Sequence, residues 1–334
     1  MRMKINAYAS PWCMSAFLLL VLLGLILLGL SIGDNGLTLQ QSVWAVFGAG
    51  DTFAVFLIQE LRLPRIIAAI LSGAALAVAG CLLQTLARNR LATPNVIGLD
   101  NGATAFAVAS IVAVPVSLAT PVLALTGAAT AAALAFGLSA GSGARGYRFI
   151  IMGIGVGAVF GALTNFMLAR TDMDSANSAY PWTVGSLNAR PEEAIYWLGC
   201  ALILSVPFAV YVARSLNTMR LSDAVAIGLG ASIRQTRWLT LIVVVLLTGF
   251  SVALAGPIGI IALAAPEAAR SMSSANRVPV LSAGLVGSCL MLLADTIGQY
   301  AFSPIEVPVG LITAIVGGPY LIWILLRQPQ QSTL

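Results

Sequence analysis

Long apolar runs alternate with short polar segments along this chain. Most of the runs contain about 20 residues, the length that an α-helix needs to cross a bilayer. The predicted spans are Trp12–Ile32, Ile66–Ala87, Val96–Val116, Leu118–Leu138, Phe149–Ala169, Ala194–Ala213, Trp238–Ala255, Ile258–Ala269, Val280–Ile297 and Val309–Leu326. The pattern therefore predicts an all-α polytopic membrane protein of about ten transmembrane helices, with residues 1–334 forming a single transmembrane domain.

The positively charged residues orient these spans. Ten spans put both termini on one side of the membrane, and the loops on that side hold Arg2, Lys4, Arg88, Arg90, Arg145, Arg148, Arg214, Arg220, Arg234, Arg237, Arg270, Arg277 and Arg327. The opposite side holds only Arg62, Arg65, Arg170 and Arg190. Because Lys and Arg are enriched in cytoplasmic loops, we expect both termini to be cytoplasmic.

The composition narrows the classes of function. Of the 334 residues only 9% are charged and 59% are hydrophobic, whereas a soluble domain carries about 25% charged residues, so the surface must face lipid. The chain has no histidine, and its four cysteines form no C-x-x-C pair, so we expect neither a metal site nor a bound haem. The net charge of +5 comes from basic residues that are concentrated in the loops on one side of the membrane. The charge therefore reflects membrane topology, and no nucleic-acid partner is expected.

The sequence also lacks an energy source of its own. No G-x-x-x-x-G-K-[ST] motif occurs, so the chain is not expected to be an ATPase. Asp100, Glu267 and Asp295 lie near the ends of predicted spans, whereas a carrier driven by ions usually keeps an ionisable group in mid-membrane. A transporter without a P-loop or a mid-membrane ion site must be driven by a partner protein that supplies the energy. The alternatives are a stand-alone secondary carrier or channel and a membrane scaffold that transports nothing.

The longest connection on the predicted cytoplasmic side covers about residues 215–236. Small and apolar residues alternate within it, from Asp223 to Gly230, which predicts short helices with an exposed apolar face. Such a helix can lie on lipid as an interfacial helix, or it can dock into a groove of a partner and couple the two proteins. The residues alone leave both interpretations open.

Two short segments resemble each other. Residues 75–80 read ALAVAG and residues 251–256 read SVALAG. They fall in spans that are predicted to run in opposite directions, which is the pattern of the inverted repeats from which many transporters are built.

A series of motifs follows in order from about residue 60 to 326. They are Leu61–Arg65, Gly73–Leu76 with Gln84, Arg88–Pro94 with Gly98 and Gly102, Trp182 with Gly185–Leu187, Asp223–Gly230, Ala255–Gly259, Ala265–Arg270, Ala294 with Asp295, and Pro308–Gly310 with Thr313 and Gly317–Pro319. As an ordered set they resemble the FecCD-type permease family, the transmembrane subunits of type II ABC importers for iron–siderophores, haem and cobalamin. The resemblance implies the type II importer permease fold, with its inverted repeat.

The resemblance also implies roles for particular residues. The implied sites are binding-protein docking by Arg62 and Arg65, ATPase coupling by Asp223, Ala226, Leu229 and Gly230, a cytoplasmic gate at Asn89, Leu91, Gly146 and Tyr147, and a periplasmic mouth at Trp182, Gly185, Ser186 and Asn188. Residues 182–188 look like the short helix that lies at this mouth.

Most of these roles have a simpler alternative. The two arginines could be interfacial anchors, and Trp182 could belong to an aromatic belt. Asn89 could cap a helix, and Leu91 could serve packing alone.

Three residues depart from the family pattern. Arg90 stands where proline is usual, Glu267 where histidine is usual, and Gln299 where arginine is usual. The change at Gln299 removes a docking charge. Asymmetric docking is therefore expected, and with it a heterodimer of permeases.

The implied assembly lies in the bacterial inner membrane. It contains two ABC ATPase subunits, a second permease subunit and a periplasmic siderophore-binding protein. The expected cargo is a ferric siderophore, with a lean towards catecholates, and haem or cobalamin is the alternative. No cofactor is expected in this chain.

Overall fold

The computed structural model describes residues 11–32, 37–112, 120–139, 147–220, 222–272 and 278–327, and within them it contains helices but no strand. The longer helices are α1 (Pro11–Ser31), α4 (Leu63–Leu86), α5 (Leu99–Val112), α6 (Thr120–Leu138), α7 (Tyr147–Arg170), α9 (Glu192–Met219), α11 (Ile233–Ala255), α12 (Gly259–Met272), α13 (Val280–Tyr300) and α14 (Val309–Arg327). The shorter ones are α2 (Leu39–Val46), α3 (Thr52–Phe56), η1 (Leu57–Arg62), α8 (Met173–Val184), η2 (Pro94–Ile97) and α10 (Asp223–Gly228).

Each of the ten predicted spans coincides with one of the longer helices, so the all-α polytopic prediction is confirmed. Seven segments of the described chain are long and apolar enough to cross a membrane: Cys13–Ser31, Thr52–Leu86, Thr120–Leu138, Ile151–Arg170, Glu192–Met219, Ile233–Ala255 and Val280–Tyr300. Within the described residues, helices α5 and α12 cover 14 residues each, about 21 Å at 1.5 Å per residue. These described segments are shorter than the roughly 30 Å of hydrocarbon.

The second predicted span starts too late. Helices α3, η1 and α4 follow one another without a break, so the helical segment begins at Thr52 rather than at Ile66. The π-helical turn η1 precedes Pro64, and the N–H of Leu63 bonds to the carbonyl of Ile58. Because proline has no N–H to donate, the wider turn lets the helix continue past Pro64.

Helix α4 is the centre of the bundle and packs against α9, α11, α12 and α13. Gly73 faces Gly287 of α13, and Gly80 faces Ala262 of α12, so closely that a Cβ on either α4 glycine would overlap the backbone of the other helix. Small residues of this kind let membrane helices approach each other. They fix the distances between α4 and the two helices that hold its polar partners.

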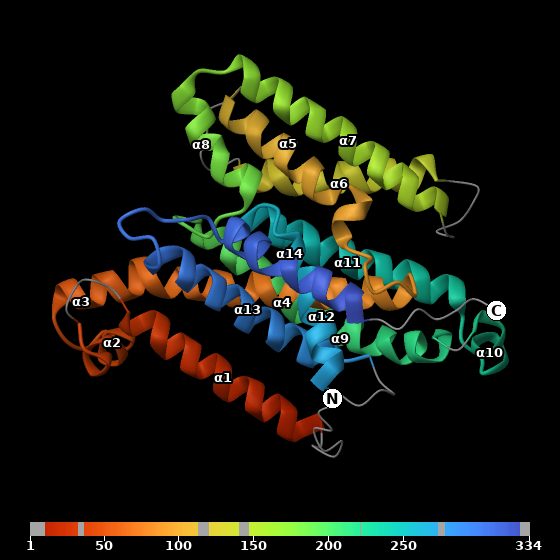
Figure 1. Ribbon diagram of the computed structural model, residues 1–334, viewed down its shortest axis with the longest axis horizontal. Coiled ribbons are helices and arrows are strands. Elements are labelled where there is room, and N and C mark those ends of the chain that lie inside the picture. The colour runs from red at the N-terminus through yellow and green to blue at the C-terminus, as the bar shows by residue number, and fades with distance from the viewer. Residues whose placement is uncertain are drawn as a thin grey trace.

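The similar segments 75–80 and 251–256 lie on α4 and at the end of α11, which pack against each other. Helix α4 begins at the end of the bundle where α3 lies, whereas α11 begins at the end where α10 lies (Figure 1). The two helices therefore run in opposite directions, as expected, and the inverted repeat itself stays a prediction.

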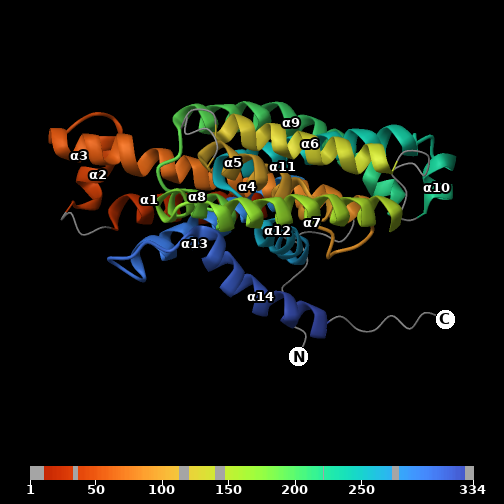
Figure 2. The same cartoon turned by 90° about the horizontal axis from the view of Figure 1, so that it is seen from above.

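The layers of the bundle are visible in Figure 1, where α5–α8 lie along one side, α1 along the other and α4 between them. In Figure 2, α14 diverges from the rest of the bundle. The short helices α2, α3 and α8 gather at one end, here called the α8 end, and α10 lies at the opposite, α10 end (Figures 1 and 2). The predicted site residues accordingly fall into two groups, one at each end.

Candidate functional site

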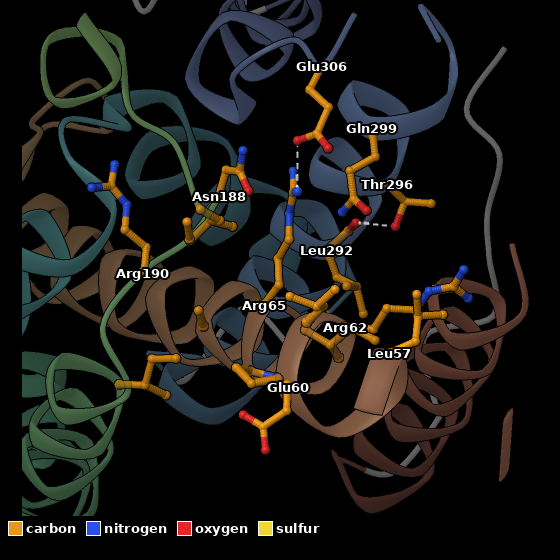
Figure 3. Close-up of a pocket in the computed structure, with 18 of the residues that line it drawn as sticks. Leu57, Glu60, Arg62, Arg65, Asn188, Arg190, Leu292, Thr296, Gln299 and Glu306 are labelled. Carbon is orange, nitrogen blue, oxygen red and sulfur yellow. Dashed lines mark hydrogen bonds and ion pairs between the residues drawn. The ribbon is translucent and has the colours of Figure 1, made fainter. Parts of the chain in front are cut away.

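A cavity of about 430 Å³ opens at the α8 end, between η1, the start of α4, the segment before α9, and α13 (Figure 3). Its polar lining residues are Glu60, Arg62, Arg65, Asn188, Arg190, Thr296, Gln299, Tyr300 and Glu306. The structure thus brings the two predicted docking arginines and one residue of the predicted mouth, Asn188, to the same cavity.

Arg65 is held by carboxylates of its own chain. Its Nε and Nη2 lie 3.0 Å and 3.1 Å from the two carboxylate oxygens of Asp295, and its Nη1 lies 2.9 Å from Glu306 Oε2. The side chains of Arg65 and Asp295 are only 14% and 2% exposed. Gln299, the departure from the family pattern, donates its Nε2 to Asp295 Oδ2 at 2.6 Å.

Arg62 has a different environment. Its Nη1 donates to the carbonyl oxygen of Leu30 at 2.6 Å, and it has no ion pair within the described part of the chain. A carbonyl does not neutralise a cation, so Arg62 keeps its full charge at the cavity. Docking by Arg62 and Arg65 stays a prediction, for which Arg62 offers the freer charge.

The prediction of a short helix at residues 182–188 is wrong about where the helix lies. Helix α8 ends at Val184, and only residues 182–184 belong to it. Gly185 has φ +82° and lies against Pro257 and Ile258, where a Cβ would come within 2.7 Å of both. This positive φ, which glycine adopts at no steric cost, ends the helix. After Gly185, the backbone N–H of Ser186 donates to the carbonyl of Ala255 at the end of α11, at 2.8 Å.

Trp182 and Arg190 pack together beside the cavity. Trp182 is buried with alanines of α5 and α6, which argues against the aromatic-belt alternative. The Arg190 guanidinium lies 4.1 Å from the centre of the Trp182 ring, and its Nε donates to the Ser186 carbonyl at 2.9 Å. Burial lowers the pKa of Arg190 to about 10.

At the α10 end, residues 87–93 form the loop that leaves α4. Arg88 adopts φ +50°, and Asn89 accepts a hydrogen bond from the N–H of Leu91 at 2.9 Å through its side chain. Asn89 thus closes a turn instead of capping a helix. Leu91 is 43% exposed, which argues against a role in packing alone. The gate role of Asn89 and Leu91 stays a prediction.

The other two predicted gate residues are less fully described. Gly146 lies outside the described residues. Tyr147 is the first residue of α7, and its side chain also lies outside the described part. The second constriction therefore stays a prediction.

Helix α10 is anchored at one face and exposed at the other. Ser222 caps it by accepting from Val225 N at 3.1 Å, and Ala226 is fully buried. Ile227 and Leu229 are 63% and 67% exposed, and Gly230 follows with φ +82°. The predicted short helix with an exposed apolar face is confirmed.

Asp223 ties α10 to two neighbouring segments. Its Oδ1 lies 2.5 Å from Arg88 Nη2, and its Oδ2 lies 2.8 Å from Arg237 Nη2 of α11. The same Arg88 nitrogen also donates to the carbonyl of Met219. A displacement of α10 would therefore be felt at the loop 87–93.

A second network joins that loop to α12. Arg90 Nη1 lies 2.9 Å from Glu267 Oε1, and Arg270 Nη1 lies 3.1 Å from Glu267 Oε2. Sequence reasoning missed this pair. The available signal was the opposite charge of the two departures, Arg90 and Glu267.

Asp100 is the remaining carboxylate that the sequence singled out. It lies in the first turn of α5 and is buried, and its Oδ1 has no hydrogen-bond partner within the described residues. No group of three or more His, Cys, Asp or Glu side chains in the described part could hold a metal ion. One isolated carboxylate does not form the ion cage that a secondary carrier would need.

The chain is similar to permeases over nearly its whole length. The model of the FecCD transport family matches residues 19–327. The Fe(3+)-citrate import system permease protein YfmE of Bacillus subtilis is 36% identical over 315 residues, which are 93% of this chain and 94% of that protein. The ferric enterobactin transport system permease protein FepG of Escherichia coli is 34% identical over 305 residues, covering 91% and 92%.

The fold is similar to that of a solved transporter. A metal-chelate type ABC transporter, in an inward-facing conformation, superposes with a TM-score of 0.83 at 25% identity, covering 96% of this chain and all of that one.

Proposed function

The chain belongs to the FecCD transport family, and from that premise we propose that it passes a ferric siderophore, received from a periplasmic binding protein, across the bacterial inner membrane. As a member of this family it is the permease subunit of an ABC importer, and ATP is hydrolysed by a separate subunit. ATPase and binding-protein partners follow from that membership. We infer that both termini are cytoplasmic, which makes the α10 end the inner one and the α8 end the outer one.

Helix α10 carries the proposal about coupling. Its apolar side chains Val225, Ile227 and Leu229 are exposed, while Ala226 and Asp223 fix the helix to the bundle. An apolar face on a rigidly held helix suits a groove on a partner protein. A helix that only rests on lipid would need no such anchors. We therefore assign α10, with Asp223, Ala226, Leu229 and Gly230, to the contact with the ATPase.

The proposed gate and mouth lie at the two ends of the transport pathway. Asn89 and Leu91 lie at the inner end, in the loop 87–93 that α10 contacts through Arg88, and we assign them to the cytoplasmic gate. Gly185, Ser186 and Asn188 lie at the outer end beside Trp182, where the cargo would enter. Arg62 and Arg65 would meet the binding protein there, because cations facing acidic groups of a partner supply register and speed of association.

A second permease subunit is proposed to pack on α7. Helix α7 contacts α5 and α6, and it exposes a stripe at spacings of four and three residues: Ile151, Gly155, Ala158, Ala162, Asn165 and Ala169. Another part of the α7 surface exposes bulky apolar side chains, Ile154, Val159, Leu163 and Phe166, as α9 does with Ile203, Leu204, Phe208 and Tyr211. Small residues and an amide suit a helix partner, whereas bulky apolar side chains suit lipid. Gln299, in place of a docking arginine, favours a second subunit that differs from this one.

The experiment that tests the assembly is a pull-down of the tagged chain from its native membrane in mild detergent, with every co-purifying protein identified by mass. An ABC ATPase together with a second, related permease is the expected result. An ATPase alone would favour a homodimer. Isolation of the chain by itself, in a detergent shown to preserve such complexes, would contradict the proposal and favour a secondary carrier.

The cargo is tested separately by uptake. Cells that carry the intact system should accumulate iron supplied as a ferric catecholate siderophore, and deletion of this chain should abolish that accumulation. Uptake of haem or cobalamin in place of every ferric siderophore tested would move the cargo to the alternative class.

A further inference from the structure

The loop that bears Asn89 and Leu91 is tethered on both sides of Asn89. Arg88, just before it, reaches Asp223 of α10, and Arg90, just after it, reaches Glu267 of α12 at 2.9 Å. The loop therefore cannot move away from either helix without breaking an ion pair. The two tethers attach it to different helices, so each can transmit a different displacement.

The tether to α12 continues into the bundle. Glu267 uses its second oxygen for Arg270, one turn further along α12, and Arg270 Nη1 lies 2.7 Å from Gln84 Oε1. Gln84 is buried in the last turn of α4, and its Nε2 donates to the Leu263 carbonyl at 3.3 Å. The network thus starts on α4, passes through α12 and returns to the loop that follows α4.

We propose that Arg90 and Glu267 are a positioning pair that holds the loop 87–93 against α12 and sets the closed position of the inner gate. The proposal rests on the proposed function, because it assigns the gate to Asn89 and Leu91. Both residues of the pair are departures from the family pattern. The structure pairs them with each other, so the two changes compensate within one chain and need no contribution from a second subunit.

The burial of the two side chains explains how the pair can both hold and release. Arg90 is 60% exposed, whereas Glu267 is 16% exposed and stays bonded to Arg270. An exposed ion pair shifts an equilibrium by no more than about fivefold. The carboxylate is therefore a fixed anchor, and the arginine is the part that detaches when the gate opens.

The same geometry yields variants that keep the fold. Arg90→Gln removes the tether but leaves Glu267 paired with Arg270. Glu267→Gln removes the charge but keeps an oxygen that can accept from Arg270. Arg90→Lys retains the cation and serves as the conservative rescue. Arg214→Gln, at an exposed arginine of α9 without an ion pair in the described chain, is the matched control.

The test uses the whole importer in proteoliposomes, with and without its binding protein. Arg90→Gln and Glu267→Gln should each raise the basal ATPase rate about two- to fivefold and lower the ratio of stimulated to basal rate by the same factor. The basal rate of the double variant should not exceed that of the more strongly affected single variant, because both substitutions remove the same Arg90–Glu267 ion pair. Arg90→Lys and Arg214→Gln should remain near wild type, and the melting temperatures should all agree.

The outcomes separate this inference from the function on which it rests. Equal basal rates in all variants, or single effects that simply add in the double variant, would overturn the positioning pair while the importer stands. A wild-type chain that assembles with no ATPase would overturn the proposed function and the pair together.

Discussion

Arginine–carboxylate contacts hold both ends of the bundle, but they differ in burial. At the α8 end, Arg65 and Asp295 are 14% and 2% exposed and share two hydrogen bonds. At the α10 end, Arg88 and Asp223 are each more than two-fifths exposed. A buried pair is costly to break because it leaves an uncompensated charge, whereas an exposed pair contributes little. The Arg65–Asp295 pair at the α8 end is therefore built to persist, and the Arg88–Asp223 pair at the α10 end can rearrange.

The largest effect is expected from Asp295→Asn, which breaks the buried pair. The Arg65 cation would keep only Glu306, itself half-exposed. We expect the free energy of unfolding in detergent to fall by about 3–5 kcal/mol. Denaturation followed by circular dichroism measures it, with Glu306→Gln as the exposed control. A loss below about 1 kcal/mol would remove the contrast between the ends.

Leu229→Asp should have the next largest effect. It should weaken assembly with the ATPase and leave the stability of the chain unchanged. The new charge would sit in the apolar contact with the ATPase. We expect the affinity for the ATPase to fall at least about tenfold, or ~1.4 kcal/mol, with unchanged unfolding. Co-purification yield measures this, and Leu229→Met, which stays apolar, is the control. Undiminished yield would refute the assignment of α10.

Asp223→Asn is the counterpart of Asp295→Asn at the α10 end. It weakens the contacts with Arg88 and Arg237, but both partners keep access to solvent. We expect less than about 1 kcal/mol of lost unfolding free energy, together with a measurable drop in cargo transported per ATP. A loss as large as that of Asp295→Asn would mean that burial does not distinguish the two ends.

The smallest effect is expected from Arg62→Gln at the cavity of the α8 end. The charge lies at the rim, so its removal should slow docking of the binding protein about two- to threefold at low salt. The difference should vanish at high ionic strength. Association rates measured against salt concentration test this, and a salt-independent difference would assign Arg62 to structure instead of docking.

Hydropathy alone was enough to predict the membrane helices of this chain, because lipid demands long apolar segments. It failed at boundaries that polar residues obscure. Gln59 and Glu60 interrupt the apolar run before Ile66, yet the helix continues through them. Helix α5 starts at Leu99 instead of Val96 because Pro94–Ile97 and Gly98 form a separate turn before it.

The candidate sites were predictable to different degrees for a physical reason. The exposed face of α10 depends on local spacing and could be predicted from residues 223–230. The pairs Arg65–Asp295 and Arg90–Glu267 join residues 230 and 177 positions apart, so they depend on how α4 packs against α13 and α12. Only the opposite charges at positions 90 and 267 gave an advance signal.

The central claim, that this chain is the permease of an ATP-driven siderophore importer coupled through α10, is tested most directly in proteoliposomes. The assembled complex, with its binding protein outside and ATP inside, should accumulate radiolabelled ferric siderophore, and the complex with Leu229→Asp should not. ATP-independent accumulation, or equal uptake by the two complexes, would contradict the account.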